Sequence, residues 1–116
     1  MKILKRLTNC IKKVYFIYNK YTVPLLFEYD EAKSIINLEK HGIDFVEAQR
    51  LWDDKNAIDA VTDTKNEKRF IHVGKLSDKA YSAIYTIRGS RIRLISVRRA
   101  RAKEVQKYEE HHRRRT

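Results

Sequence analysis

Apolar residues between positions 31 and 41 recur at the i, i+3, i+4 spacing of an amphipathic helix. The apolar stripe consists of Ala32, Ile35 and Ile36. Asp30 is placed to cap the first turn of this helix, and Gly42 is placed to end it. A second helix is expected to begin at Asp44. Its apolar face consists of Phe45, Ala48, Leu51 and Trp52.

Beyond residue 56 the period of the pattern changes from 3.6 to 2, which predicts strands. Short turns separate the strands, so we expect an antiparallel meander. The four predicted strands are residues 57–63, 69–76, 80–88 and 91–99. The segment LFEYD, which begins at Leu26, is compatible with a short edge strand. A C-terminal helix follows over residues 100–112, and its inward residues are predicted to be Ala102, Val105 and Tyr108.

These elements predict an α+β fold in which two N-terminal helices pack on one face of a four-stranded antiparallel sheet, with a C-terminal helix added. A chain of 116 residues is long enough for one domain with one modest core. We place that domain at residues 26–116. Residues 1–25 form a basic N-terminal extension that could be flexible.

The positive charge is concentrated at the two ends of the chain. The formal net charge is +11, with six basic and no acidic residues in 1–26, and eleven basic and three acidic residues in 88–116. This asymmetry favours a polyanionic partner, of which nucleic acid is the commonest. Two alternatives are that the basic ends only aid solubility, or that the first segment lies on a membrane as a basic amphipathic helix.

Composition excludes several classes of protein. The single cysteine, Cys10, cannot form an intrachain disulfide, which favours a reducing, cytoplasmic location. Three glycines leave no phosphate-binding loop of the P-loop or dinucleotide type, and the four histidines have no zinc-ligand spacing. No apolar run is long enough to cross a membrane. We therefore expect no cofactor and no metal site.

Lys33, Asn37, Lys40 and His41 share one side of the predicted helix 31–41. Few acidic residues could pair with this side, so it is a candidate surface for an anion. The alternative is an ordinary solvated helix face.

The last predicted strand and the residues after it carry a cluster of arginines. These are Arg91, Arg93, Arg98, Arg99 and Arg101. Some could pair with Asp59, Asp63 or Glu67, but the arginines outnumber these acids, so several are expected to face phosphate. Tyr81 and Tyr85 on the neighbouring strand could stack on bases, or could pack in the core.

Three segments carry a resemblance to a known family. They are FEYDEAKSIINLEKHGIDFVEAQRLWDD, EKRFIHVGKL and RIRLISVRRARAKEVQKYEE, which occur in this order between Phe27 and Glu110. Together they resemble the BrnT family of toxins from type II toxin–antitoxin modules. The basic extension before Leu26 departs from the family pattern, and Tyr29 stands where members often have tryptophan.

The resemblance implies a fold like that of RelE-type ribonucleases and cleavage of RNA without a metal. It also implies neutralisation by a BrnA-like ribbon-helix-helix antitoxin, with operator DNA bound only through that antitoxin. Metal-free cleavage uses the 2′-hydroxyl as nucleophile and leaves a 2′,3′-cyclic phosphate, so the site needs a base, an acid and cations. His41 or Glu67 could be the base.

The predicted catalytic residues are Lys33, His41, Glu67, Arg69 and Arg98. The predicted RNA-binding residues are Asn37, Lys40, Tyr85, Arg93 and Arg99. We expect helix 31–41 to lie beside the end of the last strand, so that both groups reach one phosphate. Two other functions stay open: a non-catalytic basic module that binds nucleic acid, and a membrane-associated protein that uses residues 1–25.

Overall fold

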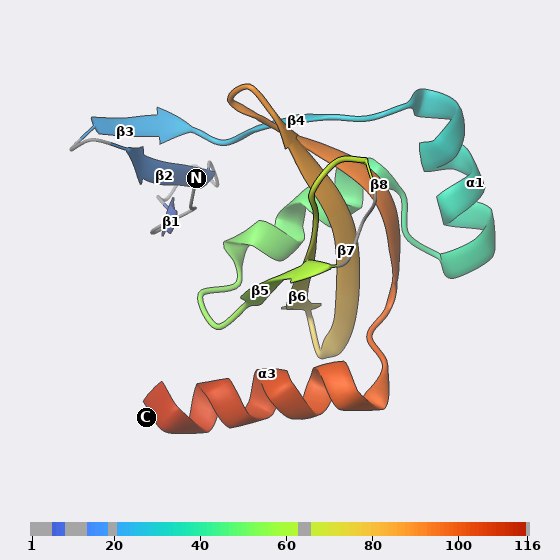
Figure 1. The fold of residues 1–116 in the computed structure, drawn as a ribbon. Helices are drawn as coiled ribbons and strands as arrows, with labels where there is room; N and C mark the ends of the chain where they lie inside the picture. Colours follow the sequence, from blue (N-terminus) through green and yellow to red (C-terminus); the bar gives the residue numbers. More distant parts are fainter. Residues whose placement is uncertain (1–5, 9–13, 19–20, 63–65, 116) are drawn as a thin grey trace.

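The computed structural model describes residues 6–8, 14–18, 21–62 and 66–115 (Figure 1). The elements follow in the order β1 (Arg6–Thr8), β2 (Val14–Tyr18), β3 (Tyr21–Pro24), β4 (Leu26–Glu28), α1 (Glu31–His41), α2 (Phe45–Ala48), the 3₁₀ helix η1 (Gln49–Asp53), β5 (Ile58–Thr62), β6 (Arg69–Leu76), β7 (Lys79–Arg88), β8 (Arg91–Arg99) and α3 (Ala102–Arg115). The strands form a three-stranded sheet, β1-β2-β3, and a five-stranded sheet, β4-β8-β7-β6-β5.

The three-stranded sheet occupies the segment predicted as a basic extension. Its strands pair antiparallel in sequence order. No strand was predicted there, although the letters VYFIY of β2 are aromatic and β-branched residues that favour strands. The segment was also expected to be possibly flexible. Part of it, residues 1–5, 9–13 and 19–20, lies outside the described residues.

The five-stranded sheet confirms the meander and corrects its size. Strands β5 to β8 pair antiparallel, as predicted, and the bounds of β6 and β8 match the prediction. The sheet has a fifth strand, however, because β4 pairs with the start of β8 in parallel. The sheet is therefore mixed. The long connection through the helices permits a parallel pair, and a three-residue strand is too short for its direction to be read from alternation.

Helix α1 has the predicted bounds and caps. The Asp30 carboxylate accepts from the backbone N–H of Ala32, and Gly42 ends the helix in the left-handed conformation, at φ 75°. Its orientation is the reverse of an ordinary amphipathic helix. The buried residues of α1 are Ser34 and Asn37, whereas the apolar stripe is exposed. The apolar spacing therefore does not mark the inner face of this helix.

Polar contacts explain this orientation. The Asn37 side-chain N–H group donates to the carbonyls of Ile43 and Val97, at 2.8 Å each, and its oxygen accepts from the Val97 N–H at 3.1 Å. The Ser34 hydroxyl accepts from the Phe45 N–H at 2.9 Å. Strand β4 pairs with β8 only as far as Arg93, so the amide of Asn37 takes the place of a strand partner at Val97. Helix α1 therefore lies beside the end of β8, as expected.

The second helix is shorter than its pattern suggested, because α2 changes into the 3₁₀ helix η1 after one turn. Its predicted apolar face is nevertheless confirmed as the centre of the core. The four residues Phe45, Ala48, Leu51 and Trp52 are all buried against the sheet. The Trp52 ring stacks on His72 with centroids 3.9 Å apart, and its edge meets Tyr85.

Helix α3 lies at the end of the sheet where the β6–β7 turn is (Figure 1). Its Glu104 accepts from the hydroxyl of Ser82, whereas Tyr85 contacts Trp52 of η1. Because residues 82 and 85 of one strand point to opposite faces, α3 and η1 cover opposite faces. Tyr108 is buried and Val105 is half-buried, as predicted, but Ala102 is exposed. The first turn of α3 is held by hydrogen bonds of Glu104 instead of by apolar packing.

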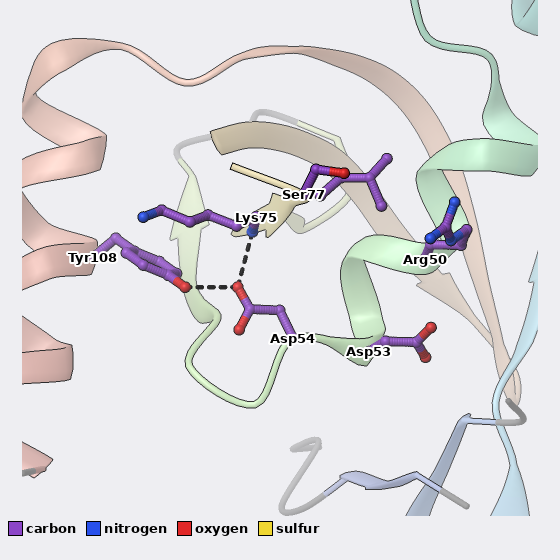
Figure 2. A pocket seen from close by; sticks show the side chains of 7 residues that line it. Arg50, Asp53, Asp54, Lys75, Ser77 and Tyr108 are labelled. Atoms are coloured by element: carbon purple, nitrogen blue, oxygen red, sulfur yellow. Dashed lines mark hydrogen bonds between the residues drawn. The ribbon is translucent and has the colours of Figure 1, made fainter. Parts of the chain in front are cut away.

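Asp54 fixes the middle of α3 (Figure 2). Its Oδ2 accepts from the Tyr108 hydroxyl at 2.7 Å and from the Lys75 backbone N–H at 2.8 Å. Burial and the hydrogen bond to Asp54 raise the pKa of the Tyr108 hydroxyl above its ordinary value. This contact closes one side of a pocket between η1, the β6–β7 turn and α3, which is lined by Arg50, Asp53, Asp54, Lys75, Leu76, Ser77 and Tyr108.

Candidate functional site

The half of the sheet face that α3 does not contact presents a row of basic side chains. Arg69 of β6 and Arg93 of β8 each pair in register with Thr86 of β7. Residues directly opposite one another share a face, so both arginines flank Thr86 on this face. Arg88 of β7 pairs in register with Arg91 of β8, two residues closer to the β7–β8 turn. We call this surface, formed by Arg69, Thr86, Arg88, Arg91 and Arg93, the basic sheet face.

Neighbouring hydroxyls hold the backbone on both sides of Arg69. The Thr86 hydroxyl, which is buried, donates to the Lys68 carbonyl at 2.8 Å. The Thr62 hydroxyl donates to the carbonyl of Arg69 at 3.2 Å. The start of β6 is therefore fixed by side chains from both adjacent strands. This arrangement gives the backbone at Arg69 a defined position at the edge of the face.

Acidic residues neutralise part of the basic sheet face. Arg93 pairs with Glu28 of β4 at 3.2 Å, and Arg88 lies 3.7 Å from Glu67. The alternative of ion pairing therefore applies to these two arginines. Among the described residues, no ion pair with a carboxylate is formed by Arg69 or Arg91, and both are exposed. Asp63, a predicted partner for the arginines, lies outside the described residues.

The remaining predicted cations lie at the other end of the sheet. Lys33, Lys40 and His41 are exposed on α1, beside Val97 at the end of β8. The guanidinium of Arg99 lies over the Tyr81 ring, 5.7 Å from its centroid. Strand register places Arg98 opposite Ser82, four residues along β7 from Thr86. Four residues of strand span about 13 Å. The predicted site residues are thus divided into two groups.

Arg98 belongs to the packing of α3. Its two terminal nitrogens donate to the two carboxylate oxygens of Glu104, at 2.9 Å each. Glu104 also accepts from Ser82 and from the backbone N–H of Arg101, at 2.8 Å each. The hydrogen bond from Arg98 lowers the pKa of Glu104 to about 2, against the opposing effect of burial. Arg98 therefore has a structural role in holding α3, and its predicted catalytic role stays a prediction.

Two predicted RNA-binding residues are buried in the protein. Asn37 is 6% exposed and uses its amide on Ile43 and Val97. Tyr85 is 2% exposed, stacks on Phe70 and donates its hydroxyl to Asp59 at 2.7 Å. Burial and the nearby Asp59 charge raise the pKa of this hydroxyl far above its ordinary value. In this structure neither side chain presents a surface to a base.

His72 was not predicted as part of any polar cluster. It is buried, and its Nδ1 lies 3.0 Å from both carboxylate oxygens of Asp59. Its Nε2 lies 3.0 Å from the Leu51 carbonyl oxygen. Because its two ring nitrogens contact Asp59 of β5 and Leu51 of η1, this histidine ties β6 to both elements in the interior. The alternation of β6 placed His72 on the same side as Phe70, which was a usable signal for its burial.

No group of three or more His, Cys, Asp or Glu residues is placed to hold a metal ion in the part of the chain that the structure describes. In the same residues, no helix is long and apolar enough to cross a membrane.

Comparison with known proteins identifies a family. Residues 29–104 match the model of a family described as the ribonuclease toxin BrnT of type II toxin–antitoxin systems. The match covers well over half of the chain, including Glu67 and all the residues of the basic sheet face. No curated protein matches the chain.

Proposed function

We propose that this chain, which belongs to the BrnT family of ribonuclease toxins of type II toxin–antitoxin systems, cleaves RNA on its basic sheet face. The observation that supports this most directly is the pairing of Arg69 and Arg93 with the buried Thr86. Two guanidinium groups on one face can contact adjacent phosphates of an RNA backbone. Arg69 has no ion pair with a described carboxylate, so its charge is available to the substrate.

The proposed reaction is a metal-independent transesterification. Glu67 takes the proton of the 2′-hydroxyl, and the 2′ oxygen attacks the adjacent phosphorus. The P–O5′ bond then breaks, which leaves a 2′,3′-cyclic phosphate, while water or an acidic group protonates the leaving 5′ oxygen. Arg69 and Arg93 stabilise the charge that develops on the phosphorane oxygens. Glu67 is preferred to His41 as the base, because His41 lies on α1 with the other group of cations.

A non-catalytic RNA-binding module is the second candidate. The observation in its favour is that both carboxylates of this face are ion-paired, Glu67 with Arg88 and Glu28 with Arg93. Both carboxylates are therefore engaged with arginines of the protein itself. The two functions make opposite predictions for the fate of bound RNA.

The deciding experiment incubates the purified chain with end-labelled RNA in the presence of EDTA. Cleavage to products with a 2′,3′-cyclic phosphate, and protection of RNA that carries a 2′-deoxy sugar at the cleavage site, would support the proposal. Arg69→Ala is expected to lower the cleavage rate by about 10²–10³. Arg114→Ala removes an exposed arginine from α3 and should leave the rate unchanged. RNA that is bound and stays intact would instead establish the binding module.

The family also implies an antitoxin partner for this chain. We propose that this partner is a BrnA-like ribbon-helix-helix protein, which neutralises the toxin and alone contacts operator DNA. Such antitoxins dimerise, so the expected complex contains at least two copies of each chain. Cellular RNA as substrate and a cytoplasmic antitoxin would place the toxin in the cytoplasm.

A further inference from the structure

The row of residues beside the basic sheet face is mainly apolar. Ile71 of β6 pairs in register with Ile84 of β7, and Ile84 pairs with Ser96 of β8. Arg69 and Thr86 stand two residues away on the first two of these strands, so the row shares their face of the sheet. We call Ile71, Ile84 and Ser96 the middle row, because they lie between the basic sheet face and the residues that hold α3.

The helices leave the middle row partly open. All three of its side chains are half-buried. Among the residues that the structure describes, neither isoleucine belongs to the hydrophobic core or to the side chains packed against it. Helix α3 is held farther along the strands, where Glu104 accepts from Ser82. Ser82 stands two residues beyond Ile84 on β7, toward the β6–β7 turn. An apolar floor therefore lies next to the arginines of the basic sheet face.

A β-bulge in β8 decides which side chain completes this row. Tyr85 of β7 pairs with Leu94 of β8. The preceding residue, Ile84, pairs with Ser96, so Ile95 is an extra residue in the strand. In a regular strand, alternation would place Ile95 in the row. The bulge thus puts a hydroxyl group, in place of a third isoleucine, at the end of the apolar floor.

The Ser96 hydroxyl has no hydrogen-bond partner among the described residues. The neighbouring hydroxyls of β7, those of Ser82 and Thr86, both donate to acceptors of the protein. A hydroxyl can donate or accept a hydrogen bond. An apolar floor with one convergent polar group is the usual form of a site that orients a small flat group.

The adjacent cations indicate which flat group this is. Arg69 and Ile71 are two residues apart on one face of β6, which is a separation of about 7 Å. The base and the phosphates of one nucleotide are separated on the same scale, so a phosphate held by Arg69 brings a base over the middle row. Proteins read single-stranded RNA through unstacked bases, and apolar side chains contact the faces of such bases. A second copy of the chain would instead set the arginines of two basic sheet faces against each other.

We propose that the middle row is a base-binding subsite of the RNA site. One nucleobase next to the cleaved phosphate lies flat on Ile71 and Ile84, and the Ser96 hydroxyl pairs with the edge of that base. The inference rests on the RNA cleavage proposed above and adds the residues that select the position of the cut. The middle row takes no part in the reaction itself, so its variants should change KM and base preference more than kcat.

The test of the floor compares the RNA of the cleavage assay with two versions that each lack one base, on one or the other side of the cleaved phosphate. The parent chain should cleave one of these abasic RNAs with a kcat/KM about 10-fold lower than that of the complete RNA. Ile84→Ala should lower kcat/KM on the complete RNA by about 10-fold, mainly through KM. On that abasic RNA it should lose nothing further, because the missing base and the missing side chain remove the same contact.

Val61→Ala is the matched control. Val61 is exposed on β5 and pairs in register with Phe70, which stacks on Tyr85 on the other face of the sheet. Its loss should leave kcat/KM at the parental value on every RNA. If the RNA is bound without being cleaved, the same comparison is made with dissociation constants.

Ser96 is tested with four RNAs that differ only in the base at the responsive position. The parent chain should cleave them with unequal kcat/KM values. Ser96→Ala should bring the four values within about threefold of one another, because the edge of the base loses its partner. Ser96→Thr keeps the hydroxyl and should keep the parental order of the four bases.

Several results would overturn the inference. Parental kcat/KM on the complete RNA in both Ile71→Ala and Ile84→Ala would do so, and so would equal cleavage of all four RNAs by the parent chain. An equal loss on complete and abasic RNA would show that the isoleucines are structural. A dimeric toxin that becomes monomeric in Ile84→Ala, measured by light scattering, would assign the row to a second copy. Failure of the proposed cleavage site is distinct from these results, because it would appear as full activity in Arg69→Ala.

Discussion

Arg98 is expected to stabilise the whole domain, because it holds α3 on the sheet. Its guanidinium forms two parallel hydrogen bonds with Glu104, and each side chain of the pair is only 20% exposed. The same carboxylate accepts from Ser82 and from the N–H of Arg101. Removal of the guanidinium therefore leaves a largely buried carboxylate with two neutral donors and no charge to balance it.

The pKa of Glu104 gives the magnitude. A folded value of about 2 against an ordinary value of 4.5 corresponds to roughly 3 kcal/mol of stabilisation at neutral pH. Partial exposure of the pair reduces this figure, so Arg98→Ala is expected to lower the free energy of unfolding by about 2–3 kcal/mol. Glu104→Gln, which keeps an oxygen for the neutral donors, is expected to cost about 2 kcal/mol.

The pH dependence has a definite sign. A carboxylate whose pKa is lower in the folded chain stabilises fully above its ordinary value of 4.5, and this stabilisation is lost as the pH falls toward the folded value of about 2. The difference in unfolding free energy between the parent and Glu104→Gln should therefore be largest at neutral pH. At about pH 3 it should have fallen by half or more.

Urea unfolding followed by tryptophan fluorescence measures both effects, since Trp52 is buried in the core. Arg99→Ala is the control, because Arg99 is exposed and only lies over the Tyr81 ring, a contact worth about 0.5–1 kcal/mol. Parental stability in Arg98→Ala, together with loss of RNA cleavage, would refute the structural role and return Arg98 to the catalytic residues. A stability difference that does not change with pH would contradict the assigned cause.

Two further predictions concern the backbone. Asn37→Ala leaves the N–H and carbonyl of Val97 without partners in the interior. It should therefore lower the free energy of unfolding, measured in urea, by about 3 kcal/mol. A decrease of less than about 0.5 kcal/mol would contradict the bridging role of Asn37. Ser77 has φ 60° at the first position of a two-residue hairpin turn, and Gly89 has the same φ at the same position of the next hairpin. Ser77→Gly should therefore raise the free energy of unfolding by about 0.5–1 kcal/mol, and Gly89→Ser should lower it. A loss of stability in Ser77→Gly would refute the assigned strain.

Local chemistry in the sequence was sufficient to define most elements. Asp30 and Gly42 set the ends of α1, because a side-chain acceptor and a residue tolerant of positive φ are what the two helix ends require. The β-branched and aromatic runs of β6 to β8, separated by two-residue turns, fixed the strands and their antiparallel order. These features act over a few residues, and a single sequence contains them.

Long-range partners decided what the sequence did not show. Helix α1 carries one polar and one apolar side, and only the unpaired backbone of Val97 makes the polar side the inner one. Arg98 was predicted to face phosphate because the arginines outnumber the acids of the neighbouring strands, and its partner Glu104, six residues later on α3, was not considered. A signal for that pair existed, since Glu104 stands three residues after Arg101 and caps its N–H at the start of α3.

The distribution of paired charges bears on how an antitoxin could block the proposed cleavage site. Folding uses Arg93, Arg88 and Arg98 in ion pairs with three glutamates, and it leaves Arg69 exposed on the basic sheet face. Helix α1, beside Val97, lies about four strand residues farther along the sheet, or about 13 Å. An antitoxin that contacted only α1 would therefore leave Arg69 open to RNA. We expect a neutralising antitoxin to contact the basic sheet face itself and to present carboxylates to Arg69.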